Sequence, residues 1–505
     1  MLSALRRTTP RCGTSLSNIR TLQTATSSQP RSRGSKKEGD ISSVFASLSG
    51  DGTATPLPPR FADIKSKLIQ SREPAIQASW SRLLTALRSE IDHISAVGSD
   101  IIPSIEFSDI SNHSRVQPFA AALKKRGAAV IRGVVDPKIA LGWKEEIRSY
   151  IKANPTTKAF PADNPAVYEL YWSPGQVKAR AHPNMLDTQR FLLSFWHSKD
   201  PSAALDTSYP VSYADRLRIR QPGDAGFALG AHVDGGSVER WEPEGYGLGE
   251  PYASVFDGKF EDFDPWECST RINIESDLYN GAGACSMFRM FQGWLSMSRT
   301  GPGEGTLLVN PLFSLATSYF LLRPFFSPVN PDSSRSGYLD EKNWQLDPVQ
   351  KPVLQGGSLG CTQELTDALH PHLELSKTMV HVPQVNPGDY VAWHCDSLHA
   401  VDKVHNGKGD SSVLYIPACP LTETNARYLV RQREAFLEGT PGPDFPGGVG
   451  ESHHSGRMGL SDVKNAGGVE GLRAMGLEGW NVKGAKTERE MSFLGAMNRC
   501  LDLPA

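Results

Sequence analysis

The stretch Gly388–Val401, which reads GDYVAWHCDSLHAV, carries the strongest signal for the fold of this chain. Its Gly-Asp pair indicates a turn, and the apolar run that follows is typical of a short strand. The strand leads to His394 and, five residues later, to His399. Either imidazole could bind a metal ion, and His405 is a third candidate, because spacing alone does not fix the path of the loop.

A second segment, Leu229–Gly236, reads LGAHVDGG and supplies further ligands. His232 and Asp234 are two residues apart, so on a strand their side chains point to the same face. A third ligand from a distant strand would complete the two-histidine, one-carboxylate face of a non-haem Fe(II) site, which leaves coordination positions open. The glycines allow the backbone to approach a ligand closely.

The His-x-Asp pattern is weak by itself, because His394-Cys395-Asp396 repeats it downstream. His232 could instead be a hydrogen-bonded histidine at a strand end, with Asp234 as a turn residue. Between the two halves, Trp294–Pro311 reads as strand, Gly/Pro turn and strand, which predicts a β-hairpin.

These motifs resemble those of the Fe(II)/2-oxoglutarate oxygenases of the phytanoyl-CoA dioxygenase type. The resemblance implies that His399 is the second iron-binding imidazole, beside His232 and Asp234, and that the cofactors are Fe(II) and 2-oxoglutarate. From about residue 61 to about residue 433 the chain is more closely similar to the DUF1479 family, whose members are expected to share the jelly-roll core. The strings that carry this resemblance are Tyr213–Asp224, His232–Trp241, Phe291–Trp294 and Trp393–His399.

The chain departs from the oxygenase pattern on the strand after His399. Many such enzymes hold the distal carboxylate of 2-oxoglutarate there with an Arg, because a guanidinium forms two parallel hydrogen bonds to a carboxylate. In this chain that strand, Asp410–Pro417, has no Arg. The candidate replacements are Arg218, Arg220, Lys403 and Arg289.

Strand alternation gives one further expectation for the cavity. On Phe288–Trp294, the side chains of Gln292 and Trp294 share one face, and Arg289 lies on the other. The resemblance places Trp294 inside, so we expect Gln292 to face the cavity and Arg289 to face away. The predicted co-substrate set is therefore Arg218, Arg220, Gln292, Trp294 and Lys403.

Composition limits the other functions. With 505 residues and a net charge of -2, the chain gives no reason to expect nucleic acid as a partner. The 7 cysteines form no Cys-x-x-Cys pair, so neither a zinc ribbon nor a disulfide framework is indicated. No apolar run approaches membrane-spanning length, so no membrane partner is expected either. A small-molecule substrate remains the expected partner, and the oligomeric state is left open.

The first 55 residues are expected to lie outside the fold. No acidic residue precedes Glu38, and six arginines are set among Ser and Thr. This composition predicts a mitochondrial transit peptide; a basic tail on a cytoplasmic protein is the alternative. Residues 56–435 should then form the oxygenase-like domain with a helical N-terminal flank, and residues 436–505 a loop-rich C-terminal extension.

Helical periodicity and turn residues predict the flanking elements. These are helices over 61–93 (interrupted at Pro74), 117–125 and 137–153, a strand over 128–132, a surface loop over 437–468 and a helix near 487–501.

Together these features predict a mainly β protein with α flanks, built on a double-stranded β-helix (jelly roll) core with N-terminal and C-terminal helices. The predicted function is hydroxylation of a small molecule with Fe(II) and 2-oxoglutarate, with no catalytic residue beyond the metal ligands. Two alternatives stay open. One is a cupin-like metal enzyme that does not use 2-oxoglutarate, which the missing Arg favours, and the other is a non-catalytic jelly-roll binding protein.

Overall fold

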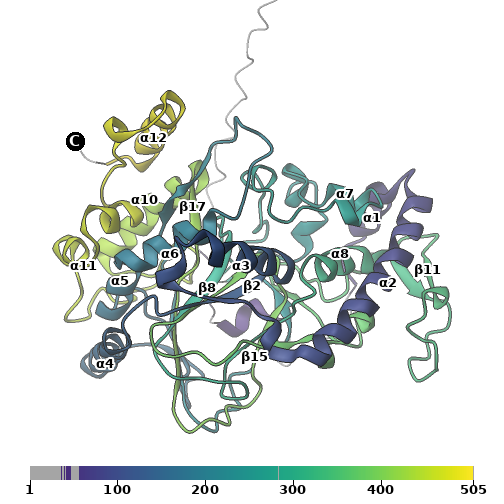
Figure 1. Ribbon diagram of the computed structural model, residues 1–505, viewed down its shortest axis with the longest axis horizontal. Coiled ribbons are helices and arrows are strands. Elements are labelled where there is room, and N and C mark those ends of the chain that lie inside the picture. Colours follow the sequence, from purple (N-terminus) through teal and green to yellow (C-terminus); the bar gives the residue numbers. More distant parts are fainter. Residues whose placement is uncertain (1–35, 37–38, 40, 47–55, 283, 504–505) are drawn as a thin grey trace, which may run out of the picture. The chain divides into compact units, whose positions relative to one another are not determined.

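The computed structural model describes residues 36, 39, 41–46, 56–282 and 284–503, which form a mixed α/β fold (Figure 1). Within these ranges there are twelve α-helices and seventeen strands. The prediction of a mainly β protein is therefore wrong about the share of helix. The strands are two to seven residues long, while helix α2 alone has 25 residues. Residues 1–35, which carry most of the transit-peptide prediction, lie outside the described ranges.

Two helices begin the domain, as the periodicity predicts. α1 spans Arg60–Ile69 and α2 spans Glu73–Val97. Pro74 lies in the first turn of α2, where a missing N–H costs no hydrogen bond. The buried face of α2 packs against α8 (Ser314–Leu322), and Trp80 stacks on Tyr319 with ring centroids 5.3 Å apart (Figure 1).

The larger sheet has eight strands. In spatial order they are β1 (Ser104–Glu106), β2 (Ala128–Arg132), β14 (Tyr390–His394), β8 (Phe291–Ser296), β16 (Ser411–Tyr415), β6 (Leu217–Arg220), β4 (Val167–Tyr168) and β3 (Ala159–Phe160). One face, which carries Leu217, Leu295 and Leu414, packs against helices and forms a continuous apolar core. The covering helices are α3 (His113–Arg126), α4 (Pro137–Ala153) and α6 (Pro183–Leu193).

The smaller sheet has five strands and faces the cavity described below. In spatial order they are β12 (Gln363–Glu364), β7 (His232–Val233), β15 (His399–Val401), β9 (Leu307–Val309) and β13 (Val380–His381). Because β8 belongs to the larger sheet and β9 to the smaller one, the predicted hairpin over Trp294–Pro311 is wrong. The Gly/Pro-rich connection between them carries the chain from one sheet to the other.

The C-terminal region is more ordered than the sequence predicts. β17 (Cys419–Thr422) pairs with β5 (Leu205–Val211), and α10 (Glu423–Glu438), α11 (Leu460–Ala474) and α12 (Glu488–Leu501) follow. The predicted surface loop over 437–468 is thus wrong from Leu460 onward, while the terminal helix is confirmed. Leu494 and Met497 of α12 are buried in a core with Leu429 of α10, so this extension packs on the domain.

The remaining elements are short. They are α5 (Pro174–Ala181), α7 (Ala253–Phe256), α9 (Leu375–Thr378), β10 (Phe326–Pro328) and β11 (Trp344–Leu346). None of the helices in the described ranges has the length and apolar composition needed to cross a membrane.

Part of the predicted leader belongs to the fold. Lys36 is buried and forms an ion pair with Asp277, which is also buried. Residues Ile41–Val44 form a 3-10 helix whose Ile41 is buried, and Phe45 follows it. The expectation that everything before residue 55 lies outside the fold is therefore wrong for these residues, because a few apolar side chains and one paired cation are enough to anchor them.

Candidate metal centre

Two neighbouring strands of the smaller sheet bring the histidines together. His232 on β7 is the direct antiparallel partner of His399 on β15. Side chains of directly opposed residues lie on the same face of a sheet. The two imidazole rings are accordingly 4.2 Å apart, centroid to centroid, at an interplanar angle of 51°.

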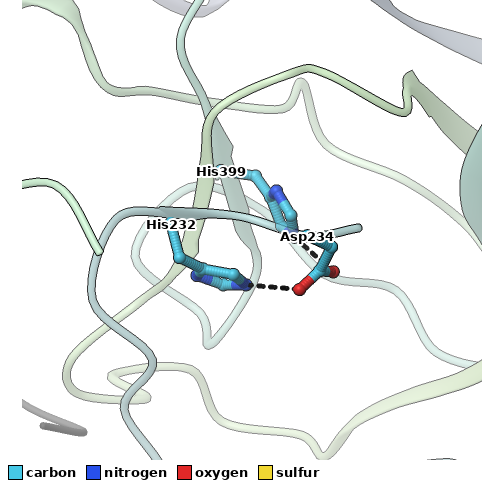
Figure 2. Close-up of side chains that lie close together, drawn as sticks. All are labelled: His232, Asp234 and His399. Atoms are coloured by element: carbon cyan, nitrogen blue, oxygen red, sulfur yellow. Dashed lines mark ion pairs between the residues drawn. The ribbon is translucent and has the colours of Figure 1, made fainter. Parts of the chain in front are cut away.

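Asp234, just after β7, completes the group (Figure 2). Its Oδ1 lies 3.9 Å from His232 Nε2, and its Oδ2 lies 3.5 Å from His399 Nε2. The ligand atoms of all three residues lie within 4.8 Å of one another. Figure 2 shows the three side chains pointing toward one another, as ligands of one ion would.

Backbone carbonyls fix both imidazole rings. His232 Nδ1 lies 2.7 Å from the carbonyl oxygen of Gly230, and His399 Nδ1 lies 3.0 Å from that of Ser397. A carbonyl only accepts, so each Nδ1 carries the proton and each Nε2 is left as a free lone pair. This is the tautomer that a metal ligand needs, held in place by its own second hydrogen bond.

The electrostatics favour the ligand forms of these groups. Burial, followed by the neighbouring His399, lowers the pKa of His232 to about 4, so its ring is neutral near pH 7. Burial alone would raise the pKa of Asp234. However, the neighbouring imidazoles of His399 and His232 and the guanidinium of Arg289 hold it well below its usual range. Two imidazoles and one carboxylate are a suitable donor set for a divalent transition metal.

Two side chains orient the carboxylate of Asp234. With its amide nitrogen toward Asp234, Gln292 donates to Oδ2 at 2.7 Å and accepts from Trp393 Nε1 at 3.2 Å. Thr362 donates to the backbone oxygen of Val233 at 2.7 Å and lies 3.2 Å from Asp234 Oδ1. Strand alternation predicts Gln292, whereas nothing in the local sequence marks Thr362, which only the pairing of β12 with β7 brings close.

A cavity opens beside the three ligands. Gln292 and Trp294 line it, as expected, and so does Arg218 of β6. Arg289 also lines it, which contradicts the expectation that this side chain faces away. The alternation argument fails there because β8 begins only at Phe291, so Arg289 precedes the strand.

The other two predicted co-substrate residues do not reach the cavity lining. Arg220 is fully buried, with its Nε donating to Asp224 Oδ2 at 2.6 Å and one terminal nitrogen donating to the carbonyl of Asp402 at 2.6 Å. Lys403 is exposed at the surface. Arg218 differs from both: it donates to the carbonyl of Gly305 at 3.0 Å, but its buried Nε has no partner among the described residues.

The competing histidines have structural partners. His394 stacks on Trp196 with centroids 4.5 Å apart, and its Nε2 lies 2.9 Å from the carbonyl oxygen of Pro265. Asp396 is held by Arg271 at 2.6 Å. The second His-x-Asp copy can therefore be explained as a buried hydrogen-bonded cluster. His405 is likewise engaged, with Nε2 2.8 Å from the carbonyl oxygen of Gly409.

No site role is predicted from the sequence for several other residues of the cavity wall. They are Ile41, Phe45, Tyr213, Arg216, Cys361 and Tyr415. Phe45 packs edge-on against His232 with ring centroids 4.9 Å apart. Such a contact between the N-terminal segment and a strand far along the chain leaves no local pattern in the sequence.

Two buried histidines and one partly exposed aspartate, open to a cavity between two sheets, define a candidate mononuclear metal protein. The profile of the Gig2-like family matches residues 55–477, and the chain belongs to this family. The resemblance to DUF1479 drawn from the sequence is thereby confirmed.

Three proteins are similar to this chain over most of its length. An Escherichia coli K12 protein, the uncharacterized protein YbiU, is 32% identical over 77% of this chain and 89% of its own length. The crystal structure of GlcNAc Inducible Gene 2, GIG2 (DUF1479), from Candida albicans has a TM-score of 0.78 and 32% identity, covering 89% of this chain and 96% of that one. A Salmonella typhimurium LT2 structure, provisionally named an oxidoreductase, has a TM-score of 0.71 and 30% identity, covering 86% and 99%.

Proposed function

We propose that this protein is an Fe(II)- and 2-oxoglutarate-dependent oxygenase that hydroxylates a small molecule. The observation that carries the proposal is the group His232, Asp234 and His399, with both Nε2 atoms directed at the carboxylate beside a cavity. Two imidazoles and one carboxylate on one side of an ion leave the opposite positions open, as non-haem Fe(II) oxygenases require.

The strand order supports a jelly-roll core. The strands β6, β8, β14 and β16 belong to the larger sheet, and β7, β9, β13 and β15 to the smaller one. These eight strands lie next to one another as β14-β8-β16-β6 and β7-β15-β9-β13. Two facing four-stranded antiparallel sheets, with the chain passing repeatedly between them, are the arrangement expected of a double-stranded β-helix.

Arg218 is the residue that we assign to the distal carboxylate of 2-oxoglutarate. It stands directly opposite Val413 on β16, the strand where the family resemblance leads us to expect an Arg. Its guanidinium contacts only a carbonyl and the hydroxyl of Ser411, so no carboxylate of the described residues competes for it. Burial lowers the pKa of Arg218, which reflects the cost of keeping this charge from water, and a bound anion would offset that cost.

The remaining residues position and shield the reactants. Gln292 and Thr362 fix the carboxylate of Asp234, while Trp294 and Trp393 form apolar walls that exclude water. When bound, Fe(II) and 2-oxoglutarate supply the oxidising chemistry: one oxygen atom of O₂ enters the substrate and the other enters succinate, with release of CO₂.

The test is succinate formation. The full chain, reconstituted with Fe(II) without oxygen and then exposed to O₂ and 2-oxoglutarate, should form succinate slowly even without its substrate, and the His399→Ala variant should not. If iron is bound but no succinate forms, the cupin-like alternative takes its place. If no iron is bound, a non-catalytic binding protein is the better account.

A further inference from the structure

We infer that the substrate of this site carries an oxyanion, a carboxylate or a phosphate group, and that Arg289 binds it. This inference rests on the proposed function, because only an enzyme has a substrate. The surroundings of Arg289 support the anion site, because this residue lies in the walls of both cavities that meet at Asp234 and Gln292.

The guanidinium of Arg289 has no ionic partner of its own. Among the described residues it makes no hydrogen bond and no ion pair, and its Cζ lies 5.6 Å from the centroid of the Tyr213 ring. A partly buried arginine remains charged near pH 7. A charged guanidinium in a cavity wall, with no carboxylate hydrogen-bonded to it, is free to form two parallel hydrogen bonds to an oxyanion.

The acidic groups around Arg289 are neutral or already engaged. Burial raises the pKa of the Cys285 thiol to about 12 and that of the Tyr213 phenol well above its usual range, so both are uncharged near pH 7. Asp215 pairs with Arg216 at 3.3 Å. Asp234 is assigned to the metal, which would take up its charge.

The backbone around Arg289 is fixed. The Asn425 side chain makes two hydrogen bonds to the backbone of Phe288, accepting at 2.8 Å and donating at 2.9 Å. Buried Asp444 accepts from the backbone of Ser286 at 2.8 Å and from the Tyr213 hydroxyl at 3.1 Å. The backbone that carries Arg289 is therefore fixed, which lowers the cost of ordering this segment when an anion binds.

The strand register separates Arg289 from the co-substrate end of the cavity. Arg218, Val413 and Ser296 lie in one row across β6, β16 and β8. Gln292, which contacts Asp234, is four residues from Ser296 along β8, a distance of about 13 Å. Arg289 precedes Gln292 in the chain, whereas Arg218 lies in the row of Ser296, so one anion could bind beside each arginine.

The experiment uses two small probes, inorganic phosphate and acetate labelled with ¹³C in its carboxylate. The full chain is loaded with Mn(II), freed of excess metal by dialysis and saturated with 2-oxoglutarate. Nuclear relaxation of ³¹P and ¹³C then reports how close each probe comes to the metal. We expect saturable enhancement for at least one probe, and about tenfold or more weaker binding in Arg289→Gln. Arg299→Gln, which removes a surface arginine, should bind as the wild type does.

The arms of the experiment separate the ligand classes. Relaxation enhancement of acetate alone indicates a carboxylic acid substrate, and enhancement of phosphate alone indicates a phosphate ester. Either result supports an oxyanion site. The proposal would be overturned if no probe shows saturable enhancement. It would also be overturned if the enhancement is lost in Arg218→Gln but not in Arg289→Gln, or if Arg289→Gln fails to hold Mn(II). Formation of succinate is measured separately, so failure of the anion site is distinguishable from failure of the proposed function.

Discussion

His232 and His399 oppose each other directly across the antiparallel strands β7 and β15, with their ring centroids 4.2 Å apart. The register of a strand pair fixes which side chains meet, so this relationship depends on backbone hydrogen bonds rather than on flexible side chains. β7 has two residues and pairs with β12 on its other side. A local sheet of three strands therefore holds the candidate metal centre.

The first prediction concerns the metal ligands. His232→Ala, Asp234→Ala and His399→Ala should each lose Fe(II), because each removes one of three protein ligands. Metal content after anaerobic reconstitution is the measurement. His394→Ala and His405→Ala are the matched controls and should keep one equivalent of iron wherever they fold. A His399→Ala protein with full iron would contradict the assignment.

The second prediction concerns Gln292. Its replacement by Leu removes the hydrogen bond to Asp234 Oδ2 while keeping most of the side-chain volume. Loss of such a partner usually weakens metal binding about 10–100-fold. Competition for Fe(II) with a chelator of known affinity would measure the change. Gln384→Leu, at an exposed amide, should leave the affinity unchanged, and equal affinities in both variants would refute a role for Gln292.

The third prediction concerns Asp396, which pairs with buried Arg271. Asp396→Asn leaves that arginine without its charge partner and should lower the free energy of unfolding by about 3–5 kcal/mol. Asp257→Asn, at an exposed pair with Arg72, should cost about 1 kcal/mol or less. Urea unfolding measures both, and iron content should stay at one equivalent if Asp396 is not a ligand.

The same carboxylate gives a pH dependence. Burial raises the pKa of Asp396, but the charges of Arg271 and His394 outweigh it and lower the pKa from 3.8 to about 2. A lowered pKa in the folded state stabilises the protein above pH 3.8, and this contribution is lost as the pH falls toward 2. The difference in stability between wild type and Asp396→Asn should shrink over that window. A constant difference would show that the pair is not ionic.

The fourth prediction concerns the N-terminal segment. A chain that lacks residues 1–46 should melt several degrees lower than one that lacks residues 1–35. Only the shorter chain loses the Lys36–Asp277 ion pair, buried Ile41 and the contact of Phe45 with His232. Calorimetry of the two metal-free proteins is the measurement, and coincident melting curves would show that this segment does not stabilise the fold.

The sequence predicts those parts of the site that lie on one local segment. His232 and Asp234 sit two residues apart, and His399 follows a recognisable apolar strand, so their residue types and spacing are visible. Pro74, Gly127 and the apolar periods likewise reveal α1 to α4 and β2. These features depend on neighbours in the chain, which is the information that patterns hold.

Contacts between distant segments could not be predicted in this way. Thr362 reaches Asp234 only through the pairing of β12 with β7, and Phe45 reaches His232 from outside the sheet. β8 and β9 look like a hairpin in sequence, yet they pair with strands of different sheets. Arg289 illustrates the limit of alternation, since the pattern holds only within a strand and β8 starts two residues later.

The most direct test of the oxygenase account is a titration of 2-oxoglutarate into the anaerobic Fe(II) protein, followed by its metal-to-ligand charge-transfer absorption. The account predicts a saturable band in the wild type. In Arg218→Gln the iron content should be unchanged. The binding of 2-oxoglutarate, measured from the midpoint of the band, should be weaker by roughly 1.5–3 kcal/mol. Arg220→Gln, whose arginine pairs with Asp224, should instead lower stability and leave this affinity unchanged wherever the protein folds. A wild-type protein that holds one Fe(II) and shows no band at saturating 2-oxoglutarate would contradict the account.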